Sequence, residues 1–116
     1  MATITKQFLS GSTQGRGVKV AATSSAGTTI HTAVGGTTDI DEVWIYASNT
    51  DSSAIKLTLE FGGTTAVDDN IVVTVAAEST ELVCPGLIIQ NGLVVKAFAG
   101  TANKITLVGY VNRMDY

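Results

Sequence analysis

The residues that could carry out chemistry are few and widely spaced. His31 is the only histidine and Cys84 the only cysteine in the 116 residues. A catalytic nucleophile needs a base beside it, and structural zinc needs about four nitrogen or sulfur ligands. His31 alternates out of phase with Ile30 and Val34, which predicts a histidine on the wet face of a strand. Cys84 precedes Pro85 in an apolar run, which predicts a small buried hydrophobe.

Acidic residues form two clusters that could in principle offer oxygen ligands to Ca²⁺. The clusters are Asp39, Asp41 and Glu42, and then Asp68, Asp69 and Asn70. Neither follows the spacing of a regular calcium loop, so we expect solvated turn residues and no metal or cofactor. A pair of glycosidase carboxylates stays open as the least favoured alternative. Only 6% of the residues are aromatic, and no aromatic-rich cleft accompanies the acids.

Trp44 and Tyr46 are the aromatic residues most suited to binding. They are two positions apart in an apolar run, so they share one face of the expected strand. The favoured interpretation is a packed face between two sheets or between subunits. The alternative is a pair of rings that stacks on a sugar, as in a carbohydrate-binding module.

The composition excludes several classes of partner. The formal net charge is −3, and the seven basic residues form no run. Nucleic-acid binding needs a basic face, as does an anionic membrane surface, so neither partner is expected. No stretch of 18 apolar residues is present, and the N-terminus lacks the pattern of a signal peptide. The single cysteine excludes an intrachain disulfide, which favours assembly in a reducing compartment.

The elements that must position these residues are strands. In residues 55–61 apolar and polar side chains alternate, which is the period of a strand with one buried face. Residues 42–49 are apolar on both sides, as expected for a strand covered on both faces. Glycine pairs and Asn91-Gly92 separate the runs, and Pro85-Gly86 is expected to break the chain. Further strands are expected at 18–22, 29–34, 70–76, 79–84, 93–99 and 104–111.

This pattern predicts an all-β fold, namely an antiparallel β-sandwich or jelly-roll-like domain of about eight short strands. No window has the apolar spacing of a long helix. The domain is expected to span residues 17–116. Residues 1–16 are expected to form a flexible N-terminal arm with Phe8 and Leu9 as apolar anchors, and a frayed terminus is the alternative.

The order of strands and turns between residues 43 and 111 resembles that of small β-sandwich proteins of tailed-phage virions. In that pattern an apolar strand ends in Ala/Cys-x-Asn, and an alternating strand then ends at glycine. An acidic-hydroxyl strand, a Gly-Leu segment, a glycine turn and two apolar strands follow. The matching segments are VWIYASN (43–49), TDSSA (50–54), IKLTLEFGG (55–63), STELVCPGLII (79–89), QNGLVVKAFAG (90–100) and KITLVGYV (104–111).

The resemblance implies a non-enzymatic structural protein, most favourably a capsid decoration (cement) protein that binds and stabilises the phage head. A head–tail adaptor, head fibre or tail protein is the alternative. The implied partner is the major capsid protein or another virion protein, and the implied location is the virion, assembled in the host cytoplasm. The surface is low in charge, which favours burial by neighbours. We therefore expect a homo-oligomer, with a trimer as the expected size. No catalytic residue is carried over, because the pattern contains no chemical site.

Overall fold

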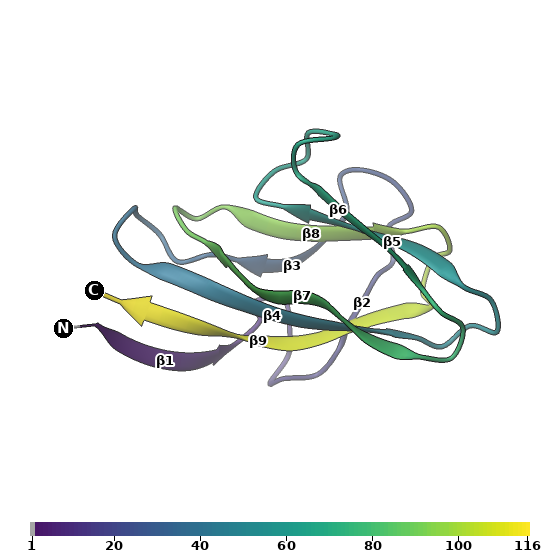
Figure 1. Ribbon diagram of the computed structural model, residues 1–116, viewed down its shortest axis with the longest axis horizontal. Helices are drawn as coiled ribbons and strands as arrows, with labels where there is room; N and C mark the ends of the chain where they lie inside the picture. The colour runs from purple at the N-terminus through teal and green to yellow at the C-terminus, as the bar shows by residue number, and fades with distance from the viewer. Residues whose placement is uncertain (1) are drawn as a thin grey trace.

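Two antiparallel β-sheets packed face to face make up the protein (Figure 1). The computed structural model describes residues 2–116, and this range contains nine strands and no helix. It confirms the predicted all-β sandwich. The strands are β1 (Thr3–Phe8), β2 (Val18–Lys19), β3 (Thr28–Thr32), β4 (Ile40–Asn49), β5 (Ile55–Phe61), β6 (Asn70–Val75), β7 (Thr80–Ile89), β8 (Val94–Ala99) and β9 (Ile105–Asp115).

The strand order is that of a jelly roll. Sheet A has the order β1-β9-β4-β7, with β2 also paired to β9, and sheet B has the order β3-β8-β5-β6. Because β1 and β2 pair with successive parts of β9, they act as one interrupted edge strand. With the two counted together, each sheet has four strands, arranged as in two Greek keys. Within residues 2–116 no helix is long and apolar enough to cross a membrane.

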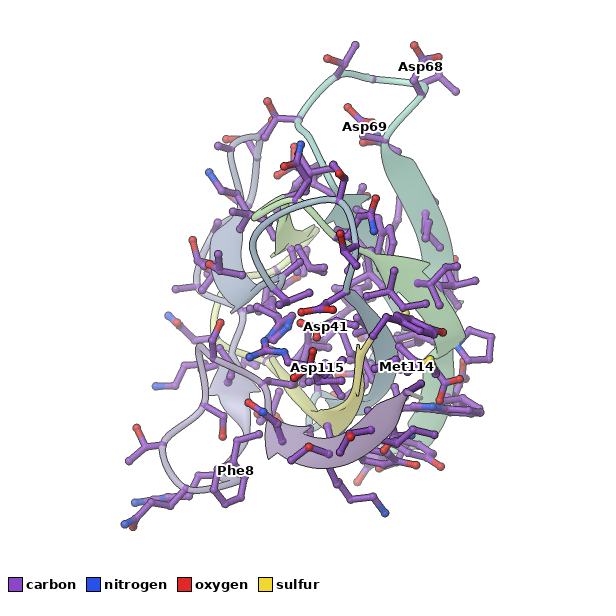
Figure 2. The ribbon with its side chains drawn as sticks, turned by 90° about the vertical axis from the view of Figure 1, so that its left-hand side faces the viewer. Phe8, Asp41, Asp68, Asp69, Met114 and Asp115 are labelled. Atoms are coloured by element: carbon purple, nitrogen blue, oxygen red, sulfur yellow. The ribbon has the colours of Figure 1, made fainter. Side chains whose placement is uncertain are left out.

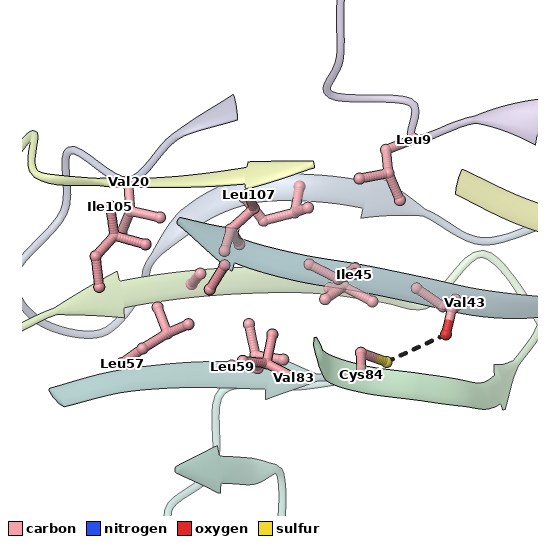
Figure 3. Close-up of a cluster of buried hydrophobic side chains, with 14 of the residues drawn as sticks. Leu9, Val20, Val43, Ile45, Leu57, Leu59, Val83, Cys84, Ile105 and Leu107 are labelled. Carbon is pink, nitrogen blue, oxygen red and sulfur yellow. Dashed lines mark hydrogen bonds between the residues drawn. The ribbon is translucent and has the colours of Figure 1, made fainter. Parts of the chain in front are cut away.

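The core lies between the sheets and follows the period-two pattern of the sequence. In β4 the buried side chains include Val43, Ile45 and Ala47, while the intervening residues face outward. Leu57 and Leu59 of β5 meet them from sheet B (Figure 3). The middle of the interface between the sheets is therefore mainly aliphatic, which suits the close packing of two β-sheets.

Residues 2–16 do not form the predicted flexible arm, and Met1 lies outside the described residues. Thr3–Phe8 pair with β9 in antiparallel register, from Thr3 opposite Asp115 to Phe8 opposite Tyr110. Leu9 follows with 1% of its surface exposed and belongs to the core, whereas Phe8 is 60% exposed on the outer face. The sequence TITKQF has a polar inner face, so the apolar alternation that marks the other strands is missing here.

Pro85-Gly86 does not interrupt β7, so the break expected there from the sequence is wrong. β7 continues through both residues to Ile89, and its register with β4 shifts twice, between Val43 and Trp44 and between Ile45 and Tyr46. Such bulges accommodate a proline in an edge strand, where its missing N–H does not disrupt a central ladder. Gly86 has φ of +76°, which suits a glycine.

The chain itself covers part of the outer face of sheet B. The residues before β3 reach across β8, and Ser25 Oγ and Gly27 N donate hydrogen bonds to the Glu60 carboxylate on β5. Thr58 and Glu60 are buried as a result, although both point away from the core. The alternation of β5 correctly assigned these side chains to the opposite face from Leu57, but did not reveal that this face is covered.

Candidate functional site

A buried charged cluster lies at one end of the sandwich, around Asp41 (Figure 2). Asp41 faces Arg113 across the β4–β9 ladder, and Arg113 donates from Nε to Oδ1 at 2.7 Å and from Nη2 to Oδ2 at 3.0 Å. His31 Nε2 lies 2.8 Å from Oδ2, and Val34 N donates to the same oxygen at 3.1 Å. The carboxylate therefore joins β3, β4 and β9.

His31 is buried, which corrects the prediction of a wet-face histidine. The register between β3 and β8 shifts between Thr29 and His31. At a bulge two residues of one strand stand opposite one residue of its partner, so strict alternation is lost. Ile30 and His31 are both buried here for this reason. The sequence around residues 29–31 contains no signal that predicts this bulge.

Asp41 is also buried, which corrects the prediction that its acidic cluster consists of solvated turn residues. The sequence did contain a signal, since Asp41 is in phase with Val43 and Ile45 on the inner side of β4. Asn49 has the same phase at the other end of the strand and is buried too. Its Nδ2 donates to the carbonyls of Ser53, Val75 and Ala76, which fixes the turn after β4.

The cluster uses its polar groups for internal bonds. His31 Nδ1 accepts a hydrogen bond from Ser10 N at 3.0 Å, so Nε2 carries the proton donated to Asp41. The Ser10 hydroxyl accepts a bond from Thr32 N. The imidazole lone pair of His31 and the hydroxyl oxygen of Ser10 are therefore both engaged by backbone N–H groups. The arrangement fastens the segment after β1 to β3.

The charge state of Asp41 follows from its surroundings. Burial by itself raises the pKa of this carboxyl, but the hydrogen bonds from Arg113 and His31 outweigh burial and leave the pKa lowered. The pKa of Arg113 is raised in turn by its hydrogen bond to Asp41. The pair is ionised at neutral pH, which satisfies the two charges within the protein.

Cys84 is a buried thiol, as predicted. It has no exposed surface, and its Sγ–H points to the carbonyl of Val43 at 3.3 Å (Figure 3). Burial raises its pKa to about 11. The reactive thiolate is therefore scarce at neutral pH, and the side chain acts as part of the core.

An exposed apolar surface lies on the outer face of sheet A. We call this surface the A face. Its side chains point away from the core on all four main strands, and several are large hydrophobic residues left exposed. The exposed members are Ile4 and Phe8 of β1, Tyr46 of β4, and Leu82 and Ile88 of β7.

Aromatic rings form the centre of the A face. Trp44 and Tyr110 are opposite each other in the β4–β9 ladder, and their rings stack with centroids 6.4 Å apart and planes 16° apart. Lys6 Nζ lies 4.8 Å from the centroid of the Tyr110 ring, a cation–π contact. A Cβ on Gly86 would approach the Trp44 ring to 2.8 Å, so this glycine makes room for the indole.

An acidic side chain beside these rings, that of Glu42, is itself bonded to the face. Glu42 accepts hydrogen bonds from Trp44 Nε1 at 2.7 Å and from Asn112 Nδ2 at 3.0 Å. The Asn112 bond and then the Trp44 bond lower the pKa of Glu42. The indole is thus held in one orientation before any partner binds, which reduces the entropy lost on binding.

The residues predicted to mediate interactions are only partly brought together. Trp44 and Tyr46 share the A face, as the alternation predicted, and Phe8 lies on the same face through its pairing with Tyr110. Leu9 points into the core and is not available to a partner. Tyr110, Leu82 and Ile88 were not predicted from the sequence to mediate interactions. Tyr110 is two positions from Val108 in β9, so alternation places both side chains on the same face.

Two recesses adjoin β1. One of about 270 Å³ lies on the A face and is lined by Lys6, Gln7, Phe8, Gly15, Gly109 and Tyr110. The other, of about 550 Å³, opens on the other side of β1 beside His31 and Arg113. Among the described residues, 2–116, no three His, Cys, Asp or Glu side chains are grouped so as to hold a metal ion.

Comparison with known proteins identifies no relative. No protein-family model, curated sequence or solved structure matches the chain. The class of protein that the structure defines is therefore a jelly-roll β-sandwich with an exposed aromatic and aliphatic sheet face.

Proposed function

We propose that the protein is a non-enzymatic structural protein of a tailed-phage virion that binds its partner through the A face. Within this class, a capsid decoration (cement) protein that stabilises the head is the leading assignment. A head–tail adaptor, head fibre or tail protein is the alternative virion role. The strand and turn order of residues 43–111, which resembles such proteins, supports the class.

The observation that carries the proposal is the exposure of large apolar side chains on one sheet face. Ile88 is 59% exposed and Phe8 60% exposed, at opposite edges of sheet A. Several large apolar side chains exposed on one sheet face mark a protein interaction site. Rigid aromatic rings at its centre suit a protein interface, in which tryptophan and tyrosine often contribute most of the binding energy.

The dimensions of the A face agree with a protein partner. Four strands about 4.8 Å apart and about ten residues long span roughly 650 Å². A standard protein interface buries about 800 Å² on each partner. The A face with its borders therefore has the area of one interface, such as that with a capsid subunit.

Binding to purified phage particles tests the proposal. The particles come from the phage whose genome encodes the chain, stripped of this protein, and bound protein is measured by co-sedimentation. Leu82→Ser with Ile88→Ser should reduce binding at least about tenfold, because each removes exposed apolar contact area. The control is Val72→Ser, which alters an exposed residue of β6 in sheet B. Equal binding by both variants, or no binding by the native chain, contradicts the proposal.

A carbohydrate-binding module is the second candidate function, favoured by the stacked Trp44 and Tyr110 rings. Sugar rings stack on such aromatic surfaces through their apolar faces. Titration with soluble polysaccharides, followed by tryptophan fluorescence, tests this role, because Trp44 is the only tryptophan. A saturable change that Trp44→Ala abolishes supports the module, and an unchanged spectrum rejects it for the sugars used.

A further inference from the structure

The two sides of the sandwich differ in charge. Every acidic residue follows residue 38, so the β1–β2 edge carries Lys6, Arg16 and Lys19 without an acid in its own segment. All three side chains are exposed. Residues 57–95, which include β6 and β7, contain no lysine or arginine. In Figure 2 the Phe8 corner and the Asp68–Asp69 corner lie at opposite ends of the molecule.

The same two sides are the free edges of sheet A. One edge is β1 continued by β2, and the other is β7. Three antiparallel pairings separate them, so β1 and β7 run in opposite directions. A second copy placed beside the first in the same orientation would therefore bring β7 against β1 and β2 as an antiparallel neighbour.

The registers of the ladders bring complementary side chains to the same height on these two edges. Val18 pairs with Leu107, which pairs with Ala47, which pairs with Glu81. Lys19 is therefore level with Thr80, one residue from Glu81 and close to the turn that holds Glu78.

A second row of pairs links the apolar residues of the two edges. Phe8 pairs with Tyr110, which pairs with Trp44, which pairs with Pro85. Ile88 pairs with the outward-facing Glu42, so it is exposed on the same face of β7 as Pro85. An adjacent copy at the same height would place Phe8 of one molecule beside Pro85 of the other, with Ile88 on the same face.

We propose that the protein associates with a second copy of itself through these edges, the basic β1–β2 edge of one molecule against the acidic β7 edge of the next. Phe8 packs beside Pro85 and Ile88, and Lys19 pairs with Glu81 and Glu78. Opposite charge favours this orientation and opposes contact between like edges. Because the two surfaces differ, the association is heterologous and generates a ring or an open chain of subunits.

Side chains carry most of this contact. Pro85 has no N–H, and the two bulges of β7 interrupt its outer edge, so a continuous main-chain ladder between copies is not formed. Strands of a sheet are rotated by about 20–25° from one to the next. Successive copies are therefore turned relative to one another, and the assembly curves.

Charge reversal tests the edge contact in the full-length chain by sedimentation. The first variant, Arg16→Glu with Lys19→Glu, has two acidic edges, and the second, Glu78→Lys with Glu81→Lys, has two basic edges. Each alone should self-associate at least about tenfold more weakly than the native chain. An equimolar mixture should associate again, because acidic edges then meet basic edges. Lys56→Glu, an exposed change on sheet B, is the matched control and should associate normally.

The results separate this contact from other modes of assembly. High salt should weaken the native association, because exposed charges are screened. A native chain that stays monomeric, or a mixture that stays dissociated while both variants are folded by melting temperature, overturns the proposal. Self-association through these edges rests on the proposed assembly role, but it is measured on the protein alone, without phage particles. Failure of the edge contact is therefore distinguishable from failure of the A face to bind a virion.

Discussion

The outer faces of the two sheets differ in what covers them. On sheet B the chain before β3 folds over β8 and bonds to Glu60, so even polar side chains of that face are buried. On sheet A the large apolar side chains of Phe8, Tyr46 and Ile88 remain exposed. The protein thus closes one face with its own backbone and leaves the other, more apolar face to solvent.

The residues that stabilise the fold are therefore expected to differ from the residues that bind a partner. Groups that face the core or lie beneath the 22–27 segment contribute to folding, because their removal leaves cavities or unpaired polar atoms. Substitution of exposed side chains on the A face should change the free energy of unfolding little, because these side chains are in contact with water in both the folded and the unfolded chain. The A face is therefore expected to tolerate substitutions that abolish assembly.

The largest effect is expected at Leu9, and its neighbour Phe8 provides the contrast. Leu9→Ala should lower the free energy of unfolding by about 2–5 kcal/mol, because it leaves a cavity in the core. Phe8→Ala should change it by less than about 0.5 kcal/mol, as at other surface positions. Urea unfolding measures both. Equal effects would show that β1 does not hold Leu9 in the core.

A smaller effect is expected where the chain closes sheet B. Glu60→Ala should cost about 1–3 kcal/mol, since Ser25 Oγ and Gly27 N lose their acceptor. Amide exchange at Gly27 should accelerate in the variant. The control is Lys56→Ala on the same strand and face, where the side chain is exposed. If Glu60→Ala melts like this control, the 22–27 segment does not stabilise the sheet.

Acid should destabilise the end of the sandwich that contains Asp41. The pKa of Asp41 is lowered in the folded protein, so its stabilising contribution is present above its ordinary value of 3.8 and is lost as pH falls below it. The melting temperature should drop in this range. Asp41→Asn should flatten the drop, although the variant is less stable at neutral pH. An unchanged acid profile would contradict the assigned role of the Asp41 pair.

The smallest effect on stability is expected for the A face itself. Leu82→Ser with Ile88→Ser should shift the free energy of unfolding by no more than about 0.5 kcal/mol per site, although it is expected to reduce particle binding. Thermal melting of the double variant checks this. A large loss of stability would mean that the A face belongs to the folding core, and the distinction between the faces would fail.

Strand positions could be predicted from the sequence because alternation is a local signal. The expected runs at 55–61, 70–76 and 93–99 correspond to β5, β6 and β8. β1 escaped notice because its inner residues Thr5 and Gln7 are polar and meet the charged end of the sandwich rather than the aliphatic core. The continuation of β7 past Pro85 depends on two bulges, which adjust the register to the partner strand and leave no pattern in the sequence.

The site could be predicted only in part for a related reason. Trp44 and Tyr46 share a face by simple alternation, so their placement on the A face was predictable. The burial of His31 depends on the bulge in β3, and the pairing of Asp41 with Arg113 depends on residues 72 positions apart. Contacts between strands that are distant in the sequence depend on the strand order, which the local pattern of residues does not reveal.

Cryo-electron microscopy of the phage particle tests the central claim most directly. If the A face binds the virion, the map should show this jelly roll on the particle, with Phe8, Tyr46 and Ile88 buried against a capsid or other virion protein. The covered face of sheet B should point to solvent. A particle without density for this fold, or one in which sheet B makes the contact and the A face stays exposed, would contradict the account.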